Sequence, residues 1–120
     1  EILGNSMDLY TLTIKYFEAF SNKDSDTLEA LYASNIYLRD WDGTHVGAYA
    51  VLAENKRLFS EVDALVIRPV ALHCDLDAST IAAEIEIMIS ADDETHCFNV
   101  VDVVEFNEQK EIVSIRAYKG

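Results

Sequence analysis

The hydrophobic pattern of this 120-residue chain changes its period once, close to Asp63. Before that point, large apolar residues recur three and four positions apart, which is the spacing of a helix face. After it, apolar residues tend to alternate with polar ones over four successive runs, which is typical of strands with one buried face. Helices followed by a series of strands indicate an α+β domain, because such helices pack on one face of an antiparallel sheet.

The first half of the chain predicts three helices and one short strand. The first helix covers residues 7–20, where apolar side chains form a wide face. Asp24 is expected to cap the second helix, because its side-chain oxygen can accept from the free amide groups of the first turn. A short strand at residues 36–40 and a third helix at 48–59 complete this half.

The second half predicts four strands, at residues 63–77, 79–90, 95–106 and 111–118. Their junctions are short and polar, and short connections join antiparallel neighbours. Pro69 lacks an amide donor and therefore predicts a bulge or a sheet edge in the first of these strands. A strongly curved sheet with helices on one face leaves a conical cavity, so we expect an α+β cone with an internal pocket.

The charge balance excludes some classes of partner. The net charge is −13, which repels phosphate backbones and anionic lipid, so we expect neither nucleic acid nor a membrane as a partner. No apolar run reaches the roughly 18 residues that span a bilayer.

We expect one domain over residues 1–120 and a cytoplasmic location. Residues 1–6 are interpreted as a cloning remnant or a disordered N-terminus, and an already removed signal peptide stays open.

One carboxylate stands on an apolar strand face. Alternate residues of a strand point the same way, so Asp102 shares its face with four large apolar residues, Phe98, Val100, Val104 and Phe106. Burial disfavours the charged form of a carboxylate, so Asp102 is expected to stay protonated and to donate a hydrogen bond. The alternative is that this face meets solvent while Val101 and Val103 turn inward.

Three further residues have ordinary structural interpretations when each is taken alone. Asp40 precedes Asp42-Gly43, and Asp is a common residue at such a turn. Tyr16 and Tyr32 lie on the apolar sides of the first two helices, where a tyrosine is usually a core residue whose hydroxyl finds a partner. None of the three indicates catalysis by itself.

The two His-Cys pairs, at residues 73–74 and 96–97, do not predict a metal site. Strand neighbours point to opposite faces, so each pair offers one ligand to a given side, whereas zinc requires three or four converging ligands. We therefore expect no metal.

Several motifs resemble the ketosteroid isomerase branch of the NTF2-like (SnoaL-like) superfamily. The similarity runs from about Ile14 to Gly120 and is most specific at its C-terminal end. The residues that carry it are Tyr16-Phe17-Glu18-Ala19-Phe20, Asp24-Ser25-Asp26, Leu31-Tyr32-Ala33, Leu38-Arg39-Asp40, Asp102, Phe106-Asn107, Ile112-Val113-Ser114-Ile115-Arg116-Ala117 and Gly120. The resemblance implies an NTF2-like cone in which three N-terminal helices pack on a strongly curved, mostly antiparallel sheet.

The resemblance also implies a catalytic site that uses no cofactor. In the isomerases, a tyrosine of the first helix and a protonated aspartate of a late strand form an oxyanion hole, and an aspartate after the first short strand is the general base. The matching residues are Tyr16, Asp102 and Asp40. The implied reaction moves a double bond next to a ketone: Asp40 transfers the proton, and Asp102 and Tyr16 bind the dienolate oxygen.

This sequence departs from the isomerases at several pocket positions. Those enzymes extend the hydrogen bonds of the oxyanion hole through two more tyrosines; Tyr32 matches one as a supporting hydrogen bond, and the other falls near Asn55. Lys119 stands where an aromatic residue is usual. These departures bear on the identity of the substrate more than on the acid and the base. We expect the substrate pocket to be lined by Phe20, Trp41, Phe59, Val100, Val104 and Tyr118.

Three functions stay open at this point, because this fold carries many activities. The leading hypothesis is a Δ5-3-ketosteroid isomerase-type enzyme that acts on a hydrophobic carbonyl compound. The second is a SnoaL-like polyketide cyclase, or another lyase or hydrolase of the superfamily. The third is a module that binds a small ligand or dimerises without catalysis. By the same resemblance we expect a homodimer formed through the outer face of the sheet.

Overall fold

The computed structural model describes residues 2–120, and for residues 2–7 it describes the backbone only. Three helices precede most of a six-stranded sheet, which confirms the expected α+β class. The elements are α1 (Ile2–Ser21), α2 (Ser25–Leu31), β1 (Tyr32–Arg39), β2 (Thr44–Val46), α3 (Ala48–Glu61), β3 (Ala64–Asp75), β4 (Thr80–Ala91), β5 (Glu94–Phe106) and β6 (Ile112–Lys119).

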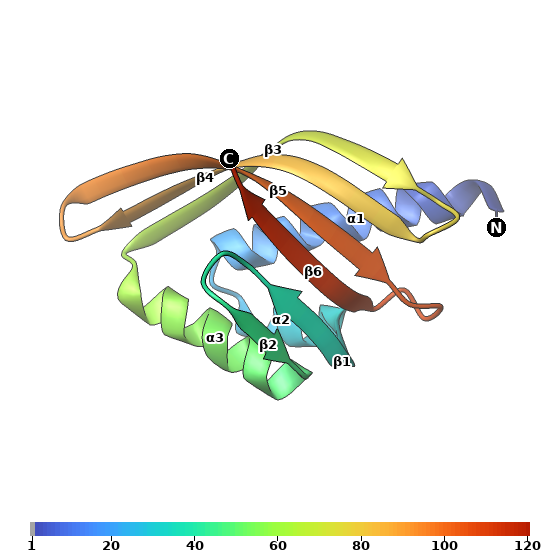
Figure 1. Cartoon of the computed structure of the whole chain (residues 1–120), viewed down its shortest axis with the longest axis horizontal. Helices are drawn as coiled ribbons and strands as arrows, with labels where there is room; N and C mark the ends of the chain where they lie inside the picture. Colours follow the sequence, from blue (N-terminus) through green and yellow to red (C-terminus); the bar gives the residue numbers. More distant parts are fainter. Residues whose placement is uncertain (1) are drawn as a thin grey trace.

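The sheet is mostly antiparallel and strongly curved. Its strand order is β2-β1-β6-β5-β4-β3, and only β1 and β6 run parallel. Figure 1 shows β3, β4 and β5 arching over α1, while α3 lies beside β1 and β2. The curved sheet and the helices thus form the cone that the pattern predicted, with its concave face covered.

The helix boundaries follow from local signals. Asp24 caps α2, because its carboxylate accepts a hydrogen bond from the Thr27 amide at 3.1 Å, as expected. The helix α1 begins at Ile2, five residues before the predicted start. The expectation that residues 1–6 are a cloning remnant or a disordered N-terminus stays a prediction, because Glu1 and the side chains of residues 2–7 lie outside the described part.

The two predictions for Pro69 are both confirmed. Its strand β3 is an edge of the sheet, and the pairing register with β4 shifts between Pro69 and Ala71. The missing amide donor of Pro69 is tolerated at such a position. Sequence reasoning missed β2, whose three residues pair with β1, because so short a strand shows no alternation.

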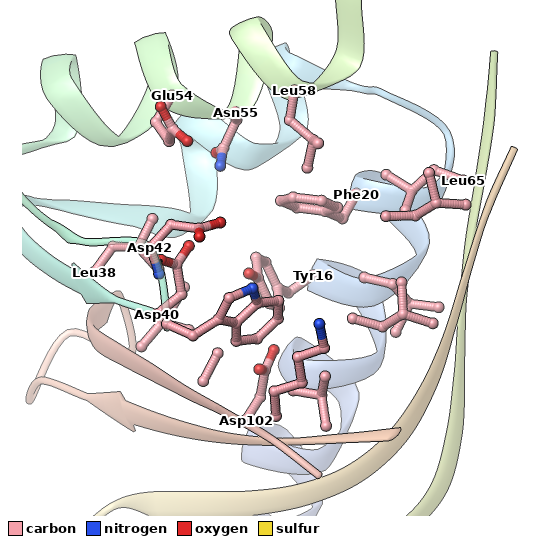
Figure 2. A pocket seen from close by; sticks show the side chains of 18 of the residues that line it. Tyr16, Phe20, Leu38, Asp40, Asp42, Glu54, Asn55, Leu58, Leu65 and Asp102 are labelled. Atoms are coloured by element: carbon pink, nitrogen blue, oxygen red, sulfur yellow. Dashed lines mark hydrogen bonds between the residues drawn. The ribbon is translucent and has the colours of Figure 1, made fainter. Parts of the chain in front are cut away.

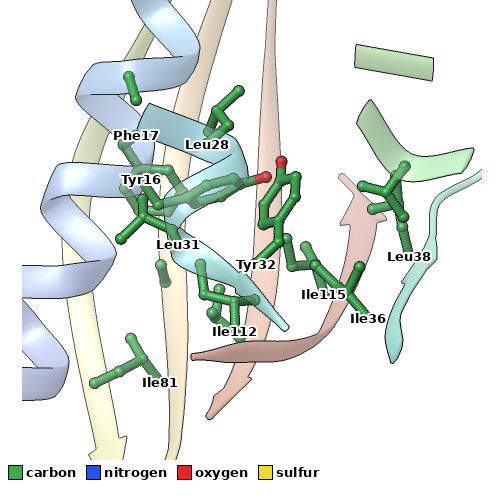
Figure 3. Close-up of a cluster of buried hydrophobic side chains, with 14 of the residues drawn as sticks. Tyr16, Phe17, Leu28, Leu31, Tyr32, Ile36, Leu38, Ile81, Ile112 and Ile115 are labelled. Carbon is green, nitrogen blue, oxygen red and sulfur yellow. The ribbon is translucent and has the colours of Figure 1, made fainter. Parts of the chain in front are cut away.

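The apolar core fills one end of the cone. Figure 3 shows side chains of α1 and α2 packed against Ile81, Ile112 and Ile115 of the sheet. These three isoleucines are almost completely excluded from solvent. The other end of the cone stays open and contains the site. No helix in the described part of the chain is long and apolar enough to cross a membrane.

Candidate active site

A cavity of about 270 Å³ lies between the helices and the concave face of the sheet. Its walls are mostly apolar, with side chains from α1, α3 and the inner faces of β3 to β6 (Figure 2). Small-molecule sites are usually apolar cavities of roughly 300–1,000 Å³ with a few polar groups. Here the polar groups include Tyr16, Asp40 and Asp102, so the fold brings together the three residues that the sequence nominated.

Asp102 lies on the inner face of β5, between Val100 and Val104. Only 6% of its surface is exposed. Burial, together with the smaller effect of the nearby negative charge of Asp40, raises the pKa of Asp102 to about 7. The alternative that this strand face meets solvent is therefore wrong, and at neutral pH a large fraction of the molecules carries a neutral, proton-donating carboxyl.

Tyr16 reaches the cavity from α1. Its side chain is 5% exposed, and burial, followed by the proximity of Tyr32, Asp102 and Asp40, raises its pKa well above the ordinary value. The phenol therefore keeps its proton and remains a hydrogen-bond donor. Figure 2 shows its hydroxyl between Asp40 and Asp102 in the interior of the cavity.

Neither of these two donors has a partner among the described residues. The hydrogen bonds of that part of the chain leave out both the Tyr16 hydroxyl and the Asp102 carboxyl. The same part contains no fully enclosed side-chain nitrogen or oxygen that lacks a partner. The two groups must therefore be reached from the cavity, because a buried polar group without a partner is costly.

Asp40 follows directly after β1 and serves two purposes. Its Oδ1 accepts hydrogen bonds from the amides of Asp42 and Gly43, at 2.8 and 3.0 Å, which holds the turn and stabilises the negative charge. Its Oδ2 accepts none from the described residues. Asp40 is thus both the turn residue and a cavity residue, since one oxygen orients the carboxylate and leaves the other free.

The supporting tyrosine has a different partner from the one expected. Tyr32 donates its hydroxyl proton to Oδ1 of Asn55 at 2.6 Å, and its ring stands 6.4 Å from that of Tyr16, centre to centre. Tyr32 therefore does not extend the hydrogen bonding of Tyr16. Asn55, near the position that matches the second tyrosine of the isomerases, accepts this hydrogen bond on α3.

Of the six predicted pocket residues, Phe20, Trp41 and Val100 line the cavity. The other three do not. Packing places Val104 and Phe59 elsewhere, and the alternation of side chains along β6 places Tyr118 on the opposite face of the sheet. Val104 lies deeper on the face of Asp102, inside the closed core, and Phe59 packs behind Phe20 with the ring centres 4.9 Å apart. Tyr118 points to the outer face, where its hydroxyl accepts from Arg39 at 2.5 Å.

Several polar residues also line the cavity. The resemblance to the isomerases had placed Lys119 at a pocket position, whereas Asp42, Glu54 and Arg57 were not predicted. Lys119, one step from Tyr118 and therefore on the inner face, holds its ammonium 5.1 Å from the Phe98 ring and 5.5 Å from the Trp41 ring. Asp42, Glu54, Asn55 and Arg57 also line the cavity. A signal existed for Asn55, because it lies four residues from Val51 and from Phe59 on the buried stripe of α3.

The described residues contain no cluster of three or more His, Cys, Asp or Glu side chains that could hold a metal ion. His73 lies 2.7 Å from Glu84 and His96 lies 3.5 Å from Glu94, both pairs being exposed. The groups that line the cavity include two proton donors, Tyr16 and Asp102, and the carboxylate of Asp40.

The chain is similar in structure to several solved proteins. An LEH-like epoxide hydrolase of M. tuberculosis superposes with a TM-score of 0.84 at 16% identity, over 95% of this chain and 84% of that one. SalBIII, an epoxide hydrolase/cyclase-like enzyme of pyran ring formation in salinomycin, gives 0.84 at 17% identity, over 96% and 92%. A protein of Catenulispora acidiphila with a ketosteroid isomerase-like fold gives 0.80 at 13% identity, over 89% and 83%.

These identities are low, so the structural likeness concerns the fold. No curated protein matches the chain in sequence. The model of the SnoaL-like domain family, however, matches residues 14–115, which is most of the chain and includes Tyr16, Asp40 and Asp102. With the curved sheet, the three helices and the internal cavity, this match shows that the chain belongs to the SnoaL-like domain family, which has the NTF2-like fold.

Proposed function

We propose that this protein is a cofactor-free isomerase that enolises a hydrophobic carbonyl compound, in the manner of Δ5-3-ketosteroid isomerase. One observation carries the proposal: two donors without partners among the described residues, Tyr16 and Asp102, share an apolar cavity with Asp40, one of whose carboxylate oxygens accepts no hydrogen bond from those residues. An enolisation needs this combination of a base for the α-proton and donors for the oxygen that becomes negative.

The proposed reaction has two proton transfers. Asp40 Oδ2 removes the proton from the carbon between the carbonyl and the double bond, and the electrons of that C–H bond move into a dienolate. The Asp102 carboxyl and the Tyr16 hydroxyl donate hydrogen bonds to the dienolate oxygen. Asp40 then returns the proton to the far carbon of the former double bond, so the product is the conjugated ketone and the base is regenerated.

The first test is an ultraviolet assay with a β,γ-unsaturated 3-ketosteroid, in which the conjugated enone is the product. We expect enone formation by the wild type and a loss of about 10²- to 10⁴-fold in Asp40→Asn, because the amide cannot accept the proton. Asp77→Asn, on the exposed β3–β4 turn, is the matched control and is expected to keep full activity. Retained activity in Asp40→Asn would refute the assignment of the base.

A second candidate is an epoxide hydrolase or cyclase. It is favoured by the structural likeness to an LEH-like epoxide hydrolase and to SalBIII, and by the polar lining on α3. The same donors could protonate an epoxide oxygen while Asp40 deprotonates the attacking water or hydroxyl. This candidate would be favoured if the protein forms a diol from cyclohexene oxide but no enone from the ketosteroid. Diol formation should then be lost in Asp40→Asn. A family member that only binds its ligand would turn over neither compound.

We also propose that the protein is a homodimer formed through the outer face of the sheet. Val66, Met88 and Tyr118 are each nearly half exposed on that face. Val66 and Met88 pair directly across β3 and β4, and exposed apolar side chains that adjoin in this way favour an interaction surface. Sedimentation of a monomer at micromolar concentration would contradict the proposal.

A further inference from the structure

Asn55 is one of the polar groups of the cavity that the proposed reaction does not use. Asn55 lies on the buried stripe of α3, four residues after Val51 and four before Phe59, and is only 4% exposed. A side-chain amide at such a position normally has partners for both its oxygen and its nitrogen.

Only one end of this amide has a partner in the described part of the chain. The Tyr32 hydroxyl donates to Asn55 Oδ1 at 2.6 Å, which fixes the orientation of the amide plane. The Nδ2 group donates to none of the described residues, although Asn55 lines the cavity. Because no fully enclosed side-chain nitrogen lacks a partner, Nδ2 must be reached from the cavity. Figure 2 shows the nitrogen of Asn55 pointing inward.

We propose that Asn55 determines the substrate class, and that the substrate carries a second oxygen, distant from the reacting carbonyl, which accepts a hydrogen bond from Asn55 Nδ2. This inference rests on the proposed function, since it assumes that Tyr16 and Asp102 bind the reacting oxygen. The Asn55 oxygen is already bonded to Tyr32, so the amide presents a donor alone, and its ligand is a carbonyl, ether or hydroxyl oxygen.

The Nδ2 donor of Asn55 affects the discrimination between substrates more than their affinity. A substrate with an acceptor at this position forms a hydrogen bond with Nδ2. A substrate that is apolar there leaves a buried donor without a partner, which is the costly case. The site should therefore reject plain hydrocarbon ketones in favour of doubly oxygenated ones of the same shape.

The inference is tested with two fluorescent probes, 6-acetyl-2-naphthol and 6-isopropyl-2-naphthol. The naphthol oxygen imitates the dienolate oxygen at Tyr16 and Asp102, and the distal groups have similar shapes, but only acetyl accepts a hydrogen bond. We expect the wild type to bind the acetyl probe about threefold to tenfold more tightly, as one neutral hydrogen bond allows. In Asn55→Leu the ratio of the two dissociation constants should fall to about one.

Two further variants separate the possible explanations. The double variant Tyr32→Phe/Asn55→Leu replaces both bonded groups by apolar ones, so it avoids an unsatisfied Tyr32 hydroxyl and should fold even if Asn55→Leu does not. It is expected to show the same ratio of about one. Asp102→Asn should change the affinity for both probes by the same factor, so the preference for the acetyl probe should remain.

Different binding results would refute the role of Asn55 and the proposed isomerase function. If both probes bind but the wild type does not distinguish them, or if the preference survives the loss of Asn55, the role of Asn55 is refuted and the proposed function stands. If neither probe binds to the wild type, the proposed function is refuted, and the inference about Asn55 fails with it.

Discussion

Asp102 makes the native state depend on pH in a direction opposite to that of most carboxylates, and Asp102→Asn should remove that dependence. Its pKa rises on folding from the ordinary 3.8 to about 7, chiefly because the side chain is buried. The native state therefore binds more protons than the unfolded state between these two values. By linkage, the contribution of Asp102 to the free energy of unfolding falls as pH rises through this window and is constant above it.

The magnitude follows from the shift. A shift of about three pKa units, at 1.36 kcal/mol each, lowers the free energy of unfolding by about 4 kcal/mol once the pH exceeds the native pKa. Asparagine matches the shape and the neutrality of the protonated acid, so the variant avoids this cost. We therefore expect Asp102→Asn to be more stable than the wild type near pH 8, with a stability difference that grows by about 3 kcal/mol between about pH 5 and pH 8.

Urea denaturation followed by circular dichroism at several pH values measures this difference directly. Subtracting the free energy of unfolding of the variant from that of the wild type cancels the contributions of the carboxylates that do not interact with Asp102. Asp77→Asn, on an exposed turn, is the matched control and should differ from the wild type by the same small amount at every pH. A difference for Asp102→Asn that does not change between about pH 5 and pH 8 would refute the reasoning, because it would mean that folding does not perturb Asp102.

Three further predictions concern activity and stability. Because Asp102 acts in its protonated form, kcat/KM for enone formation should fall as the pH rises through about 7, and a profile that is flat to higher pH would contradict this. Tyr16→Phe should lower kcat by about 10²- to 10³-fold with an unchanged circular dichroism spectrum, whereas full activity would exclude Tyr16 as an oxyanion donor. Gly47→Ala should lower the free energy of unfolding by about 1–2 kcal/mol, because φ is 93° there. Gly43→Ala, where an added methyl group meets open space, is its control in thermal denaturation, and equal stabilities would refute the argument.

Most of the fold could be predicted from the sequence because its signals are local and periodic. The change of period near Asp63 separates helices from strands, Asp24 marks a helix start, and Pro69 marks the bulged edge strand. The class and the antiparallel run of strands follow from these signals. The parallel pairing of β1 with β6 does not, because no local pattern records which distant strand becomes a neighbour.

The candidate site could be predicted only where the alternation of side chains along a strand decides which face a residue occupies. This alternation placed Asp102 among apolar neighbours, and the resemblance added Tyr16 and Asp40. Neither signal shows how deep the cavity extends, so Val104 was expected in the lining although it lies in the closed core. Nor could either signal show that the Tyr32 hydroxyl turns toward Asn55, because that contact joins α3 to the start of β1 and depends on how the two elements pack.

The strand order has a consequence for the way the site is assembled during folding. Asp40, the proposed base, follows β1, and the neighbours of β1 are the short β2 and the distant β6, where Tyr32 pairs with Ile112. The strand β5, which carries the proposed acid Asp102, reaches β1 only through β6. Such non-local pairings form late, because the intervening loop must close first. On a ribosome, the helices and β1 would emerge long before β6 is made, so the acid and the base come to share one cavity only in the last stage of folding.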